Sequence, residues 1–196
     1  RDKLAHALES LQHTAGDLAH EIIVVDNAST DGSAALVRDR FPGVRLIEPG
    51  ANRWFSGGNN LGLRAAQGTY ALILNPDTVV RPDAPELLSS ALLAGADIVS
   101  PLIVTGSPEA VWFAGGEVDA RRGVSWHFHE GQSPPPAGRD PFRTTFITGA
   151  ALMMSAQTWH ALGGFREDLF LYWEDADLCR RAVVADRRRW WCGRSR

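Results

Sequence analysis

Apolar and polar positions in the first hundred residues follow a rhythm of amphipathic helices and short buried strands. Leu4, Ala7, Leu8 and Leu11 repeat at helical spacing, which predicts a helix at the start of the chain. Residues 21–26 form a β-branched run typical of a strand buried on both faces. The same pattern predicts further strands over 44–48, 69–74 and 97–100, and helices over 34–40 (capped by Ser33), 60–66 and 83–94. This alternation predicts an α/β fold with a mostly parallel sheet flanked by helices.

The second half of the chain has no clear hydrophobic period. Residues 105–145 are rich in Gly, Pro, Trp and His, which predicts short strands and loops that cover a substrate. An apolar segment over 146–154 is interrupted by Gly149. Helices are expected over 157–162 and 174–185.

Composition limits the partners and the compartment. The 196 residues are 44% hydrophobic and carry a formal charge of −3, so no basic field attracts nucleic acid. No apolar run approaches the roughly 20 residues that span a bilayer. Two cysteines, Cys179 and Cys192, are too few for a disulfide framework, so a reducing cytoplasm is the expected location. The Arg-rich segment 187–196 could touch the anionic inner face of a membrane, but a solvated tail is the expectation.

The segment Asn75-Pro-Asp77 ends a short apolar strand with a carboxylate. Pro76 cannot supply a ladder hydrogen bond, so the strand should stop before it. Asp77 is then presented at the carboxyl end of a buried strand, where open α/β sheets bind ligands. It could hold a divalent metal between protein and phosphate oxygens. The alternative is a simple turn, since all three residue types favour turns.

Two polar segments also follow predicted strands. Residues 26–32 offer carboxylate and amide groups to the edge of a nucleobase, or form an ordinary strand-to-helix turn. Residues 52–62 contain paired glycines that let backbone approach a ligand, and Arg53 could approach a phosphate. This glycine-rich segment has neither the Gly-Lys-Ser/Thr of a Walker loop nor G-x-G-x-x-G.

Residues 170–177 lead from aromatic side chains into acids at the start of a predicted helix. Acids in a first turn are favoured by the helix dipole, so capping alone would explain them. Glu174 and Asp175 are adjacent and cannot share one helix face. One of them could cap the helix while the other faces a cleft as a general base. Trp173 could stack on a sugar ring.

Five motifs in this order resemble the family 2 glycosyltransferases, most closely the rhamnosyltransferase-like bacterial members. They are Asp-Asn-Ala-Ser-x-Asp-Gly-Ser, Asn-Arg-x-Phe-x-Gly-Gly-Asn-Asn-x-Gly, Asn-Pro-Asp, Thr-Gly-Ala and Glu-Asp-x-Asp-Leu. The likeness implies one GT-A domain over 1–182, with a nucleotide-binding half over about 1–100 and an acceptor half over about 101–182. Residues 183–196 then form a divergent basic tail.

The resemblance also implies roles for particular residues. The catalytic base would be Asp175, with Glu174 beside it, and Asp77 would bind Mg²⁺ or Mn²⁺. Thr148, Gly149, Ala150 and Trp173 would line the sugar and acceptor site. The nucleotide would lie against Asp26, Asn27, Ser29, Arg53, Gly57, Gly58, Asn59, Asn60 and Asn75.

The implied activity is inverting transfer of a sugar from a nucleotide diphosphate sugar, such as a dTDP-rhamnose-like or UDP-sugar donor. The acceptor would be a hydroxyl of a glycan or of a lipid-linked saccharide. Inversion needs one base to deprotonate that hydroxyl. A divalent metal stabilises the charge that develops on the departing diphosphate.

The chain departs from the family pattern at both ends. Relatives begin with an inner strand that precedes the first helix, and they continue beyond the Glu-Asp helix into a further strand. The expectation is a truncated chain, so a non-catalytic nucleotide-sugar-binding fragment remains an alternative. A sugar-phosphate nucleotidyltransferase would need a glycine-rich Arg-Lys loop after the first strand, and this chain has none.

Overall fold

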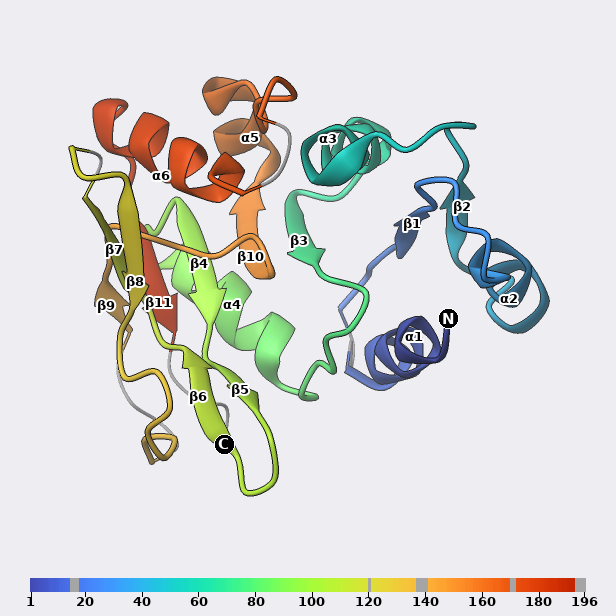
Figure 1. Cartoon of the computed structure of the whole chain (residues 1–196), viewed down its shortest axis with the longest axis horizontal. Helices are drawn as coiled ribbons and strands as arrows, with labels where there is room; N and C mark the ends of the chain where they lie inside the picture. The colour runs from blue at the N-terminus through green and yellow to red at the C-terminus, as the bar shows by residue number, and fades with distance from the viewer. Residues whose placement is uncertain (15–17, 120, 137–140, 170–171, 193–196) are drawn as a thin grey trace.

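The computed structural model describes residues 1–14, 18–119, 121–136, 141–169 and 172–192. A five-stranded sheet forms its centre, in the order β3-β10-β4-β11-β9, and a parallel pair, β1-β2, lies to one side (Figure 1). The α/β class predicted from the alternating pattern is confirmed.

The first unit of the chain surrounds the β1-β2 pair. Leu8, Val37 and Phe41 form a buried cluster there, so the periodic leucines of the first helix do face a core. Ser33 is the first helical residue rather than the predicted cap, because Gly32 takes the cap position with φ 84°. The elements are α1 (Asp2–Thr14), β1 (Ile23–Val25), α2 (Ser33–Arg40) and β2 (Arg45–Ile47).

The central sheet is mixed, although three of its five strands share one direction. Those three are β3 (Tyr70–Leu74), β4 (Ile98–Pro101) and β11 (Arg189–Cys192). Between β3 and β4 lies β10 (Ala151–Ser155), which is antiparallel to both because the chain returns through it from the second half. The short β9 (Phe142–Arg143) is antiparallel to β11. The predicted parallel set is therefore interrupted by one returning strand.

Helices cover both faces of this sheet. On one face, α4 (Ala84–Leu93) packs over Leu72, Val99 and Met153. On the other face, α5 (Ala156–Leu162) and α6 (Glu174–Val184) pack over Ile73, Leu152 and Met154 in the largest apolar cluster. The alternation of neighbouring residues along β3 and β10 follows the two-residue period of a strand.

Two hairpins make up most of the region for which short strands and loops were predicted. One consists of β5 (Ile103–Thr105) and β6 (Ala110–Phe113), and the other of β7 (Gly116–Asp119) and β8 (Val124–His127). They extend from the sheet on the side away from β1 and β2 (Figure 1).

Two sequence-based expectations differ from the structure. Residues 54–62 are helical, within α3 (Trp54–Ala65), rather than a loop that precedes a helix at residue 60. Residues 189–192 form β11 inside the sheet and are not a solvated tail. Residues 193–196 of that tail, and residues 170 and 171 of the aromatic segment, lie outside the described part of the chain. No helix in the described ranges has the length and apolar character needed to cross a membrane.

Candidate active site

Asp26 follows β1 directly and is 8% exposed. Its backbone N–H donates to Ile47 O at 2.9 Å, which continues the β1-β2 ladder by one residue. Its Oδ2 accepts from the N–H of Ser29 at 3.3 Å, while Ser29 itself is exposed. Asp26, the predicted nucleobase contact, is thus a carboxylate at the end of a strand, and the turn that follows is hydrogen-bonded to it.

Asn27 connects this turn to α3. Its Oδ1 accepts from Arg53 N at 3.2 Å and its Nδ2 donates to Trp54 O at 3.1 Å. The side-chain amide therefore fixes the start of α3. The nucleotide contact implied for Asn27 by the resemblance stays a prediction. Arg53 takes the N-cap position of α3 and is exposed.

The glycines of α3 let this helix lie close to neighbouring groups. A Cβ added at Gly58 would lie 2.9 Å from Nδ2 of Asn27, and one added at Gly62 would lie 3.3 Å from Val25. Gly57 would bring a Cβ to 3.0 Å from Arg53. Close approach to β1 and its following turn is one reason for the absence of side chains at Gly58 and Gly62.

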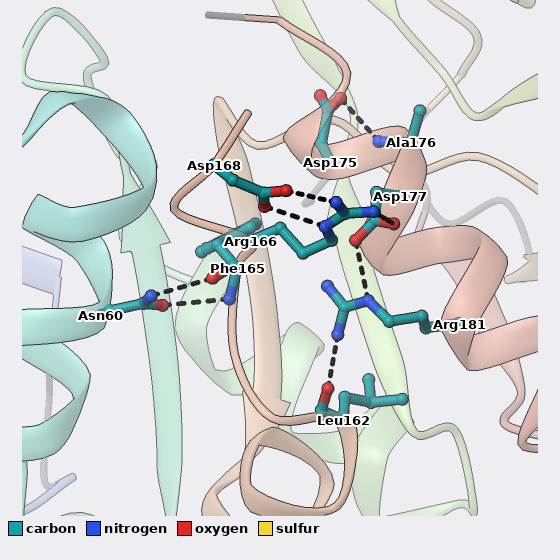
Figure 2. Close-up of polar contacts among 9 residues, drawn as sticks. All are labelled: Asn60, Leu162, Phe165, Arg166, Asp168, Asp175, Ala176, Asp177 and Arg181. Carbon is teal, nitrogen blue, oxygen red and sulfur yellow. Dashed lines mark hydrogen bonds and ion pairs between the residues drawn. The ribbon is translucent and has the colours of Figure 1, made fainter. Parts of the chain in front are cut away.

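The side-chain amide of Asn60 is used in a contact across 105 residues of sequence (Figure 2). Its Oδ1 accepts from Phe165 N at 3.0 Å and its Nδ2 donates to Phe165 O at 2.9 Å and to Glu167 Oε1 at 2.8 Å. Asn59 donates to Phe55 O in its own helix at 2.9 Å. Both asparagines were predicted to contact the nucleotide, and the structure gives both amides partners within the protein.

Asp77 lies three residues beyond the end of β3, as expected, with its side chain 49% exposed. The peptide of Asn75 extends the sheet, since its N–H donates to Ala150 O at 2.9 Å. Lys3 Nζ lies 3.3 Å from Asp77 Oδ2. The described residues contain no group of three or more His, Cys, Asp or Glu arranged around a common point. One exposed carboxylate fits a metal that takes its other ligands from phosphate and water.

Asp175 is held in place by two backbone N–H groups. Gly149 N donates to its Oδ2 at 3.0 Å and Ala176 N donates to its Oδ1 at 2.8 Å. Burial raises the pKa of this carboxyl group above its usual value, and the two hydrogen bonds oppose the rise. The Thr-Gly-Ala motif thus lies against the Asp175 carboxylate, with Thr148 buried and its Oγ1 accepting from Ala150 N.

Glu174, beside it, is 7% exposed. Among the described residues its buried Oε2 has no hydrogen-bond partner. Burial raises the pKa of Glu174, and the charge of Asp175 raises it further. The preceding Trp173 is in the left-handed region, with φ 72°, and 42% exposed. The two acids do face different surroundings, and only Asp175 has both carboxylate oxygens bonded.

A charged network that the sequence analysis missed supports the first turns of α6 (Figure 2). Asp177 Oδ2 accepts from Arg181 Nε at 2.7 Å, and Asp177 Oδ1 lies 3.8 Å from Arg166 Nη1. Arg166 also binds both carboxylate oxygens of Asp168. Arg181 donates to Leu162 O at the end of α5. The spacing of Asp177 and Arg181, four residues apart on a helix, was the one available sequence signal.

Positive backbone φ angles occur in the segments that carry the candidate site residues. Four of the described non-glycine residues with positive φ lie in the turn after β1, at the start of α3 or just before α6: Ala28, Trp54, Tyr172 and Trp173. Such conformations cost of order 1–3 kcal/mol each and gather at functional sites.

A cavity of about 670 Å³ lies on the face of the sheet that α4 covers, and Asp175 is not among its lining residues. Leu72, Leu74 and Ala151 line it, and these residues point to the face that α4 covers. Asp77 stands at its edge. The cavity therefore adjoins the predicted metal ligand without reaching the predicted base.

His127 and Trp159 pack within the protein, whereas Trp126 and Trp173 are exposed, at 44% and 42%. The His127 ring stacks on Phe146 at 5.9 Å between centroids, and its Nδ1 lies 2.9 Å from Trp112 O. Trp159 is buried in the main cluster. A positive charge on His127 would lower the pKa of Asp175.

The architecture defines the class of protein. The structure of GalNAc-T7 with UDP, GalNAc and Mn²⁺ matches 97% of this chain with a TM-score of 0.75 at 14% identity, over 39% of that chain. A Pyrobaculum calidifontis mannosyltransferase with GDP-mannose and Mn²⁺ matches 96% of the chain with a TM-score of 0.67 at 19% identity, over 50% of its own length. The protein has a GT-A glycosyltransferase fold, as the resemblance implied.

The family follows from the sequence comparison. The model described as "Glycosyl transferase family 2" matches residues 1–180, so the chain belongs to glycosyltransferase family 2. This confirms the family suggested by the five motifs.

Curated relatives agree. The Haloferax volcanii low-salt glycan biosynthesis hexosyltransferase Agl10 is 26% identical over 83% of this chain and 53% of its own length. The Mycobacterium tuberculosis N-acetylglucosaminyl-diphospho-decaprenol L-rhamnosyltransferase is 27% identical over 80% of this chain and 59% of its own. The Rhizobium meliloti succinoglycan biosynthesis protein ExoO is 38% identical over half of this chain and 28% of its own. The chain thus spans less than two thirds of each of these relatives.

Proposed function

We propose that this domain transfers a sugar, with inversion, from a nucleotide diphosphate sugar to a hydroxyl group of a glycan or lipid-linked acceptor. The donor would be a dTDP-rhamnose-like or UDP-sugar, in line with the rhamnosyltransferase among the relatives. Asp175 is the general base in this proposal, and Asp77 is the metal ligand.

The observation that carries the proposal is the setting of the Asp175 carboxylate. Both of its oxygens accept backbone N–H bonds, so its direction is fixed without a neutralising cation. Burial raises its pKa, which makes the carboxylate a stronger proton acceptor than an exposed aspartate. A single fixed carboxylate is what inversion requires, since no covalent intermediate has to be formed by a second one.

The donor half supplies binding rather than proton transfer. Asp26 and Ser29 lie at the end of β1, and Arg53 is exposed at the start of α3, where an anionic group also meets the helix N-terminus. Asp77 would hold Mg²⁺ or Mn²⁺ in contact with the diphosphate, and the metal supplies positive charge as the leaving group departs. The tight internal bonds of Asn27, Asn59 and Asn60 make these three residues supports of α3.

The test is a transfer assay with purified protein, a panel of nucleotide sugars and Mn²⁺, run beside donor binding by calorimetry. Asp175→Asn should abolish transfer while the donor still binds, because the base acts on the acceptor hydroxyl. Glu174→Gln should reduce transfer less. If the wild-type domain binds donors but transfers sugar from none of them, the alternative of a nucleotide-sugar-binding fragment is favoured.

A further inference from the structure

Phe55 and Gly149 approach each other more closely than any side chain at position 149 would allow. A Cβ built on Gly149 would lie 2.7 Å from Cζ and 3.2 Å from Cε1 of the Phe55 ring. Real Cβ atoms essentially never come within 3.0 Å of another heavy atom. The ring of Phe55, from the second residue of α3, therefore lies directly against the Gly149 backbone.

The Phe55 ring has little freedom to move away. It packs edge-to-face on Phe165, with 5.3 Å between ring centroids, and Phe165 packs in turn on Trp159 at 5.6 Å. The backbone of Phe165 is itself fixed by Asn60 of α3 through hydrogen bonds to both its N–H and its C=O (Figure 2). Helix α3 thus contacts two separate segments: Asn60 binds the backbone of Phe165, and Phe55 packs against Gly149.

Gly149 is in turn hydrogen-bonded to Asp175. Its N–H donates to Asp175 Oδ2 at 3.0 Å, and the position of its missing Cβ is 3.6 Å from the Asp175 Cβ. A displacement of the Gly149 peptide would therefore change the direction of the Asp175 carboxylate.

We propose that Phe55 and Gly149 are positioning residues, through which helix α3 of the nucleotide-binding half sets the direction of the Asp175 carboxylate. This inference rests on the proposed function, in which Asp175 is the base. Phe55 and Gly149 belong to two separate motifs, and the proposal explains both by their contact with each other. The contact between Phe55 and Gly149 therefore couples the two halves of the domain beside Asp175, the proposed base.

The experiment uses complementary changes in size. Gly149→Ala should lower kcat by about 10- to 100-fold, as expected for an angstrom-scale displacement of a reacting group. The KM for the donor should change less than kcat, because a displaced base affects the attack of the acceptor hydroxyl rather than donor binding. Phe55→Leu removes the ring atoms that meet the new methyl group. In the double variant the loss should therefore be smaller than the product of the two single losses.

The pH profile separates a positioning role from a packing role. Burial raises the pKa of Asp175, and the Gly149 hydrogen bond opposes this rise. Weakening that bond in Gly149→Ala should raise the pKa further, so the acid limb of the kcat profile should move to higher pH. A purely structural defect would lower the amount of folded protein and leave the limb in place.

Gly43→Ala is the matched control, because its added Cβ meets no atom within 4 Å. Phe55→Met, which keeps more volume, replaces Phe55→Leu if the latter does not fold. The inference is overturned if Gly149→Ala matches Gly43→Ala in kcat and pH limb while Asp175→Asn is inactive. If Asp175→Asn itself retains full transfer, the proposed function fails instead, and the two results cannot be confused.

Discussion

Arg181 Nε donates to Asp177 Oδ2 at 2.7 Å, and Arg181 lies one turn after Asp177 in α6. Both side chains are mostly buried: Arg181 is 27% exposed and Asp177 is 19% exposed. Asp177 lies two residues beyond Asp175 in the same helix. The partners of the pair, Arg166 on one side and Leu162 O on the other, connect α6 to the end of α5 and to the segment that Asn60 holds.

Removing one member of this pair should destabilise the fold. Asp177→Asn and Arg181→Gln should each lower the free energy of unfolding by about 1–3 kcal/mol, since a partly buried charge loses its partner. Urea unfolding followed by circular dichroism measures this. Arg180→Gln on the exposed side of the same helix should cost less than about 0.5 kcal/mol. Equal effects of Arg180→Gln and Arg181→Gln would show that the pair contributes nothing.

Asp77 should control metal-dependent donor binding. Its contact with Lys3 joins two exposed groups and adds little stability, so Asp77→Ala should keep the melting temperature within about 2 °C. Calorimetry with UDP or dTDP should show that Mn²⁺ strengthens nucleotide binding to wild-type protein and not to Asp77→Ala. Equal nucleotide affinity of the wild type in Mn²⁺ and in EDTA would contradict the assignment.

Asp26 should contribute to nucleotide binding independently of the metal. Asp26→Asn keeps the shape of the turn after β1 but removes the charge, and we expect nucleotide affinity to fall by roughly tenfold or more. The ratio of affinities with and without Mn²⁺ should stay as in wild type. Asp39→Asn, an exposed aspartate at the end of α2, serves as the control. An unaltered affinity in Asp26→Asn would remove this residue from the site.

His127 should influence the pH dependence of transfer. If Asp175 is the base, as proposed, it must be deprotonated, so activity should rise with pH through the pKa of Asp175, which burial raises and a charged His127 lowers. His127→Gln removes that charge, so the acid limb should move to higher pH. His129→Gln is the control, because the His129 ring is exposed and contacts Gln132. An acid limb at the same pH in both variants would exclude an electrostatic role for His127.

The elements of the fold were predictable wherever a single period dominated. The leucines of α1 and the apolar runs of β1, β3 and β4 repeat at spacings that only one kind of element satisfies. Residues 54–62 were misread because glycine and asparagine have poor helix propensity, whereas in the structure Gly58 and Gly62 let the helix lie close to Asn27 and Val25. The strand nature of 189–192 was also missed, since it depends on pairing with Ile98–Pro101.

The site was predictable at the level of motifs and not at the level of contacts. The motifs indicated where carboxylates would stand at strand and helix ends, because those positions follow from local order in the chain. The partners of Asn27, Asn60 and Asp177 come from segments 26, 105 and 11 residues away. No local pattern encodes which groups meet across such distances.

The register of β10 has a further consequence. Ala151 lies opposite Leu74, which sends Leu152 and Met154 toward α5 and α6 and leaves Gly149 two residues before the strand. A shift of one residue would turn every side chain of β10 to the other face and carry a side-chain-bearing neighbour into the place of Gly149. The apolar alternation of this strand therefore has two effects: it fills the core, and it fixes the position from which the Gly149 N–H reaches the Asp175 carboxylate.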